Sequence, residues 1–188
     1  KTLGMSMLES FFDIRKDSRK LFEGLEIAEN QALCDEWMNR YPTVSISFRQ
    51  IDGLNFMDAY RQLVYEIALL YQKHTYLLDS QAISNQEKSL FQQISDRKAE
   101  KTDVMRSIQF LTLLLNKHYN KKVILLIDEY DVPVAKANNN GYYNEMLDVM
   151  KGLMQALKDN QALRFAVVTG CLKIAKESIF TGTNNFVS

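Results

Sequence analysis

Apolar positions recur along the chain at two periods, and these periods predict an alternation of helices and strands. Helical spacing occurs in five segments, at residues 2–14, 29–40, 54–76, 104–119 and 143–157. Short β-prone runs lie between them, at residues 43–48, 123–127 and 164–170. Strands that alternate with helices predict an α/β fold with a parallel sheet.

The run at 123–127, Val-Ile-Leu-Leu-Ile, is the most apolar in the chain and ends abruptly at Asp128 and Glu129. Its β-branched content and short length favour a buried parallel strand over a helix. The span 79–101 is polar and contains no Gly or Pro, so we expect exposed loop and helix there. The cluster at residues 138–141, Asn-Asn-Asn-Gly, predicts a turn.

Composition narrows the class of protein. The chain has 188 residues, of which 46% are hydrophobic, and its 23 basic and 23 acidic side chains give no formal net charge. Such a chain can bury one sizeable core, so it is not mainly disordered. The balanced charge argues against a protein that grips nucleic acid through a strong positive field, although a specific nucleic-acid site stays open.

The apolar runs, the cysteines and the histidines give no sign of a membrane span or a metal site. No apolar run approaches the roughly 18 residues needed to cross a bilayer, so we expect a cytoplasmic protein. Cys34 and Cys171 could form one disulfide, but two buried or half-buried thiols are the favoured interpretation. His74 and His118 have no ligand partner at metal-binding spacing, which predicts surface or packing histidines.

Asp128 and Glu129 form the strongest chemical signal. An apolar strand carries these carboxylates to the carboxyl edge of the sheet, where ligands bind in open α/β folds. One carboxylate could support Mg²⁺ while its neighbour orients or deprotonates a water that attacks a phosphate. The alternative is an acidic strand end that leads into a solvated loop.

Two weaker signals lie at the ends of other elements. Lys1 and Thr2 stand directly before an amphipathic helix, as the last two residues of a phosphate-binding loop do. Without the glycine-rich part, this dipeptide alone carries almost no information. Thr169 ends the last strand, where its hydroxyl could sense a γ-phosphate or make a local backbone hydrogen bond.

Taken in order, four stretches resemble the AAA-ATPase-like family of bacterial P-loop NTPases. They are Lys1-Thr2-Leu3 with the helix that follows, residues 21–44, residues 127–133 (Ile-Asp-Glu-Tyr-Asp-Val-Pro), and Thr169-Gly170 with residues 178–185. The third stretch is close to the family's Walker B signature and is the most specific.

The resemblance implies roles for particular residues. Lys1 and Thr2 would bind the phosphates of ATP, and Thr2 and Asp128 would hold Mg²⁺. Glu129 would activate the attacking water, and Thr169 would act as a sensor. Two further matches have no chemical role that we can assign: Asp131, expected to be structural or to support the residues of the site from behind, and the pair Asn184-Asn185.

The resemblance also implies a fold. We expect a P-loop NTPase-like three-layer sandwich whose parallel sheet is incomplete, because the first strand and the glycine loop that precede Lys1 in the family are absent. The three β-prone runs would be strands 2, 3 and 4, side by side, with an open edge at 165–169. The whole of 1–188 would be a single partial domain, with a helical insertion at about 49–121.

Three functions follow from these expectations. The first is an Mg²⁺-dependent ATPase, of which residues 1–188 alone would bind ATP weakly or not at all. The second is a nucleotide-gated switch or degenerate ATPase that docks a protein partner on the insertion at 49–121. The third is a role in nucleic-acid processing, which rests only on nuclease domains fused to members of the family and lies outside this chain.

Overall fold

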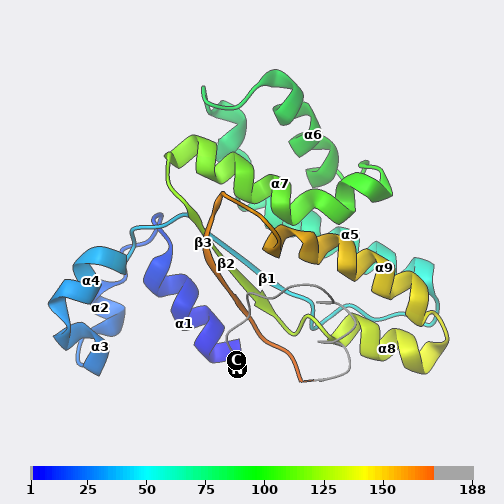
Figure 1. Cartoon of the computed structure of the whole chain (residues 1–188), viewed down its shortest axis with the longest axis horizontal. Helices are drawn as coiled ribbons and strands as arrows, with labels where there is room; N and C mark the ends of the chain where they lie inside the picture. The colour runs from blue at the N-terminus through cyan, green and yellow to red at the C-terminus, as the bar shows by residue number, and fades with distance from the viewer. Residues whose placement is uncertain (1, 172–188) are drawn as a thin grey trace.

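A computed structural model describes residues 2–171 and shows a three-stranded parallel sheet with helices on both faces (Figure 1). Strands β1 (Thr43–Ser47), β2 (Val123–Asp128) and β3 (Leu163–Val168) lie side by side in that order. Leu125 pairs with Val44 on one side and with Ala166 on the other. The predicted α/β class, the parallel sheet and the central place of the most apolar run are therefore confirmed.

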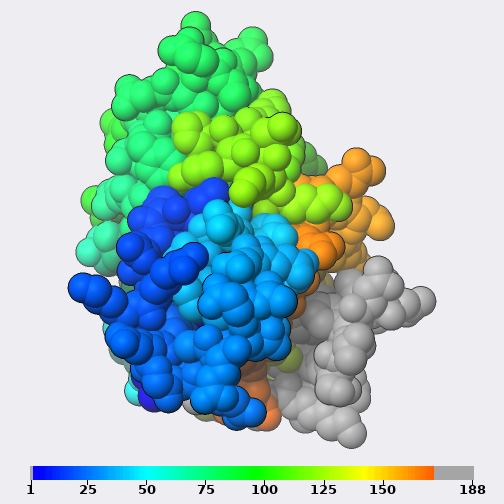
Figure 2. Space-filling model, turned by 90° about the vertical axis from the view of Figure 1, so that its left-hand side faces the viewer, coloured from blue at the N-terminus to red at the C-terminus, as the bar shows by residue number. Residues whose placement is uncertain are grey.

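Helices cover the two faces of the sheet unequally. One side carries α1 (Thr2–Phe12), α2 (Arg19–Phe22), α3 (Glu26–Glu29) and α4 (Gln31–Trp37), which Figure 2 shows as one blue layer. The other side carries α5 (Phe56–Gln72), η1 (Thr75–Asp79), α6 (Asn85–Ser95), α7 (Lys101–Tyr119), α8 (Val132–Asn140), α9 (Tyr143–Met154) and η2 (Gln155–Leu157). The result is a three-layer α/β/α arrangement, which is compatible with a P-loop-like fold.

The side chains of β2 alternate between two hydrophobic clusters. Ile124 and Leu126 pack with Met5 of α1, whereas Leu125 and Ile127 join the large core formed with α5, α7 and α9. Successive strand residues point to opposite faces, so Asp128 shares the face of Ile124 and Leu126. The alternation therefore directs Asp128 toward α1.

Two local predictions hold only in part. The span 79–101 is not merely an exposed surface, because α6 buries Phe91 and Ile94 in the main core. Its helix begins at a capping box of Ser84 and Glu87, which satisfies the first backbone N–H groups. The predicted turn at 138–141 is the last turn of α8, which ends at Gly141 with a φ of 81°.

Other expectations are met in part. β3 is the outer strand of the sheet formed by residues 2–171. Cys34 is a buried thiol, but the prediction was wrong for Cys171, which is exposed beyond the end of β3. His74 is a buried packing residue, as expected. Within the described part of the chain, no helix is long and apolar enough to cross a membrane.

Candidate functional site

Asp128 lies at the carboxyl edge of the sheet, next to the end of β3. Because β2 and β3 are parallel, Thr169 leaves the sheet at the same edge, and its backbone N–H donates to the carbonyl of Ile127 at 2.8 Å. The Thr169 hydroxyl donates to Oδ1 of Asp128, whose side chain is almost wholly buried. Two of the residues singled out from the sequence are therefore in direct contact.

Thr2 reaches the same carboxylate from the other layer. It stands at the beginning of α1, and its Oγ1 donates to Oδ2 of Asp128 at 3.1 Å, across 126 positions of sequence. Hydroxyl groups therefore occupy both oxygens of Asp128. Lys1 and the pair Asn184-Asn185 lie outside the described residues.

Glu129 adjoins this cluster in an unusual backbone conformation. Its φ is 52°, in the left-handed region, which costs an ordinary L-residue about 1–2 kcal/mol. Its backbone N–H faces the Thr169 hydroxyl at 3.5 Å, and the next N–H, of Tyr130, donates to the Thr169 carbonyl at 3.2 Å. Its half-buried carboxylate makes no hydrogen bond or ion pair with residues 2–171, so it is available for chemistry.

The loops after β2 and β3 are locked together by Asp131. This buried carboxylate accepts the backbone N–H of Cys171 at 2.6 Å through Oδ2. A side chain at Gly170 would overlap the ring of Tyr130 and approach Oδ1 of Asp131 to 2.8 Å, so the close contact requires glycine. Burial, with the Asp131 charge, raises the pKa of Tyr130 to about 12. Asp131 thus has the structural role expected of it.

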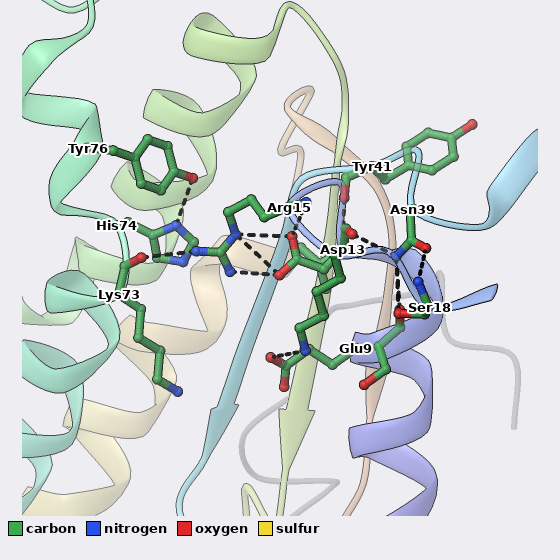
Figure 3. A network of polar contacts seen from close by, with 12 residues as sticks. Glu9, Asp13, Arg15, Ser18, Asn39, Tyr41, Lys73, His74 and Tyr76 are labelled. Carbon is green, nitrogen blue, oxygen red and sulfur yellow. Dashed lines mark hydrogen bonds and ion pairs between the residues drawn. The ribbon is translucent and has the colours of Figure 1, made fainter. Parts of the chain in front are cut away.

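The far end of α1 is held by an ion pair that the sequence did not reveal (Figure 3). Asp13 is fully buried, and both its oxygens accept hydrogen bonds from Arg15, the shortest being 2.7 Å from Nη2 to Oδ2. The bond to Asp13 also raises the pKa of Arg15. Nη1 of Arg15 donates to the carbonyl of Lys73 at 2.9 Å, beyond the end of α5. Arg15 therefore ties α1 to the opposite helical layer.

Asn39 completes the anchor of α1. Its Nδ2 donates to the carbonyls of Ser10 and Asp13 at 3.0 and 2.9 Å, and its Oδ1 accepts the N–H of Ser18. Its φ of 56° aims the side chain back at the end of α1. The only sequence signal was an Asn before the first strand, a residue type that tolerates left-handed geometry. These contacts fix the helix whose beginning presents Thr2.

The geometry suits a hard cation that takes only part of its coordination shell from the protein. Among residues 2–171 no group of three or more His, Cys, Asp or Glu side chains could hold a metal ion. Mg²⁺ usually takes only one or two carboxylates and completes its shell with water and phosphate oxygens. The Thr2 hydroxyl and the Asp128 carboxylate are oxygen donors already in contact, so the residues present fit such an ion.

Comparison with known proteins identifies a family and a relative. A family model described as Predicted AAA-ATPase matches residues 1–180. A protein of Azotobacter chroococcum mcd 1, described as an uncharacterized protein in the vnfD 5′ region, is 26% identical over 180 residues. The match covers 95% of this chain and 30% of that protein, so the chain spans less than a third of the relative's length. No solved structure gives a significant match.

Proposed function

This chain belongs to the predicted AAA-ATPase family, and on that basis we propose that it builds the Mg²⁺-dependent ATP-binding and ATP-hydrolysing site of a P-loop domain. The observation that carries the proposal is the hydrogen bond between Thr2 and Asp128. In P-loop NTPases the loop Ser or Thr and the Walker B Asp hold the metal ion together. A contact over 126 residues is not explained by local chain geometry.

Each residue then has a distinct task. Thr2 and Asp128 would hold Mg²⁺, and Lys1, which lies outside the described residues, would bind the phosphates. The ion would supply positive charge against the phosphate oxygens. Thr169 donates to Asp128 and so fixes the carboxylate's orientation, in addition to the predicted sensor role.

Glu129 is the proposed general base. Its carboxylate is next to Asp128 in sequence but has no partner among residues 2–171, so it can accept a proton from water. A backbone held in the left-handed region at such a position is typical of functional sites, because the surrounding structure must impose it. The hydrogen bonds from Tyr130 and Thr169 provide that constraint.

The test is ATP turnover by the full-length gene product and its Glu129→Gln variant. Loss of a general base lowers kcat by about 100- to 10,000-fold, while ATP binding should persist. Glu23→Gln makes the same chemical change at an exposed position away from the site, and should leave kcat unchanged. Turnover by Glu129→Gln at the wild-type rate would refute the assignment.

A second candidate is a nucleotide-gated or degenerate ATPase that docks a protein partner. The favouring observation is a set of exposed apolar side chains at 49–121: Leu54, which is 86% exposed, Met57 and Tyr65. Leu54 lies two positions before α5 and Met57 lies in its first turn, and exposed apolar patches mark interaction surfaces. ATP turnover by the wild-type protein distinguishes the two candidate functions. A degenerate ATPase binds ATP but does not hydrolyse it, even without a substitution.

A further inference from the structure

The opposite edge of the sheet from Asp128 carries a concentrated positive charge. Arg40 precedes β1, Lys121 and Lys122 precede β2, and Arg164 lies near the beginning of β3. Parallel strands bring these separate segments to one edge, and Figure 2 shows them meeting where the light-blue, yellow-green and orange surfaces join. With Glu36 and Tyr41, the four basic residues line a hollow of about 410 Å³.

The charge of this basic hollow is not neutralised by the protein. None of its four exposed cations forms an ion pair with a carboxylate of residues 2–171. Arg40 and Lys121 donate instead to backbone carbonyls, each at 3.2 Å. Four cations against the single carboxylate of Glu36 leave three positive charges, in a chain whose net charge is zero. A bound polyanion would relieve this mutual repulsion.

An aromatic platform adjoins the cations. Tyr41, in the wall of the hollow, stacks on Trp37 with ring centroids 5.1 Å apart and planes at 27°. The guanidinium of Arg164 lies 5.2 Å from the Trp37 ring centroid, so one cation is already held against the stack. Trp37 also packs on Phe12 and Phe165. These contacts fix the position of Trp37, and with it the ring of Tyr41 that stacks on it, so a base can stack there without rearrangement of the side chains.

We propose that this hollow binds single-stranded nucleic acid, with the cations on consecutive phosphates and a base stacked at Tyr41. Cations that track a backbone beside an aromatic ring are the usual elements of single-strand binding. The hollow, at about 410 Å³, has the size of a small-molecule pocket and can take one nucleotide, and stacking at Tyr41 requires a base that is not already stacked within a duplex. The inference does not depend on ATP hydrolysis at the opposite edge.

Binding of a fluorescein-labelled dT15 oligonucleotide to the full-length gene product, followed by anisotropy, tests the proposal. Release of counterions from three or four phosphates predicts a slope of about −2 to −3 in log K against log salt. Affinity should therefore fall about 20- to 50-fold between 50 and 200 mM salt. A 15-base-pair duplex should bind more weakly than the single strand, and equal or tighter duplex binding would overturn the assignment.

Two matched double variants distinguish binding at the basic hollow from non-specific attraction to positive charge anywhere on the protein. Lys121→Ala/Lys122→Ala should weaken binding and reduce the salt slope by about 1.4. Lys73→Ala/Lys88→Ala removes the same charge from two lysines without ion pairs on the other helical layer, and should change neither quantity. Equal weakening by both pairs would show non-specific attraction and refute the proposal.

Substitutions of Tyr41 test the stacking contribution to oligonucleotide affinity, because they leave the charge of the hollow unchanged. Tyr41→Ala should weaken dT15 binding about 5- to 100-fold by loss of stacking, whereas Tyr41→Phe should bind like the wild-type protein. Circular dichroism confirms that each variant is folded. Loss of binding in Tyr41→Phe, or none in folded Tyr41→Ala, would contradict the stacking role. ATP turnover without oligonucleotide stays at the wild-type level in the lysine variants.

Discussion

Lowering the pH from 7 to 5 should destabilise this protein through one buried imidazole, that of His74. The side chain is almost wholly buried, and its Nδ1 lies 3.1 Å from the Tyr76 hydroxyl. Burial, together with the nearby positive charge of Arg15, lowers the pKa of His74 from 6.5 to about 3. Asp13 acts in the opposite direction, and Lys73 adds to the lowering. The folded protein therefore keeps His74 neutral at pH 5, while the unfolded chain protonates it.

The sign and size of this change in the free energy of unfolding follow from the linkage between folding and proton binding. Because the folded-state pKa is depressed and the group is a base, stability is lost as the pH falls below 6.5, and the loss levels off below about 3. With these two pKa values, protonation stabilises the unfolded state by about 0.2 kcal/mol at pH 7 and about 2 kcal/mol at pH 5. His74 alone should thus remove about 2 kcal/mol of stability over this range.

Urea unfolding followed by the fluorescence of Trp37, the single tryptophan of the chain, measures the effect. The control is His74→Asn, whose side chain can place a polar atom near the Tyr76 hydroxyl but does not titrate. Both proteins contain the same carboxylates and His118, so the difference between their pH-induced losses isolates His74. The variant should lose about 2 kcal/mol less than the wild-type protein between pH 7 and 5. Losses that agree within about 0.5 kcal/mol would refute the reasoning.

Three further predictions concern the anchor of α1 and the candidate site. Asp13→Asn leaves Arg15 without its counter-charge and should lower the free energy of unfolding by about 2–3 kcal/mol, measured by urea unfolding at pH 7; an unchanged value would mean that the pair contributes nothing. Gly170→Ala should cost about 1–3 kcal/mol by overpacking, seen as a lower melting temperature, and wild-type stability would show that the loops yield. Thr169→Val keeps the side-chain shape but removes the donor to Asp128, so kcat for Mg²⁺-ATP should fall at least about 10-fold in steady-state assays, whereas an unchanged kcat would exclude an orienting role.

Much of the fold was predictable because it depends on local periodicity. The apolar run at 123–127 could satisfy its backbone and bury both faces only as a central parallel strand, and it does so as β2. Asp128 and Thr169 could be placed at one edge for the same reason, because parallel strands end on the same side. The buried face of α6 was missed because Leu90, Phe91 and Ile94 are only three apolar positions in a polar segment of 11 residues, and the layer that covers them comes from distant residues.

The sequence by itself determined the order of the three strands and of five of the helices, the parallel sheet and the identity of the acidic edge, since each is encoded in neighbouring residues. Only the tertiary structure decided that Thr2 touches Asp128, that Asp13 is buried against Arg15, and that four cations share one hollow. The first and the last of these join segments that are adjacent only after the layers pack, and Asp13 and Arg15, although two residues apart, are buried together only by that packing. Burial, charge pairing and proximity are properties of that packing, and no local pattern of residue types contains them.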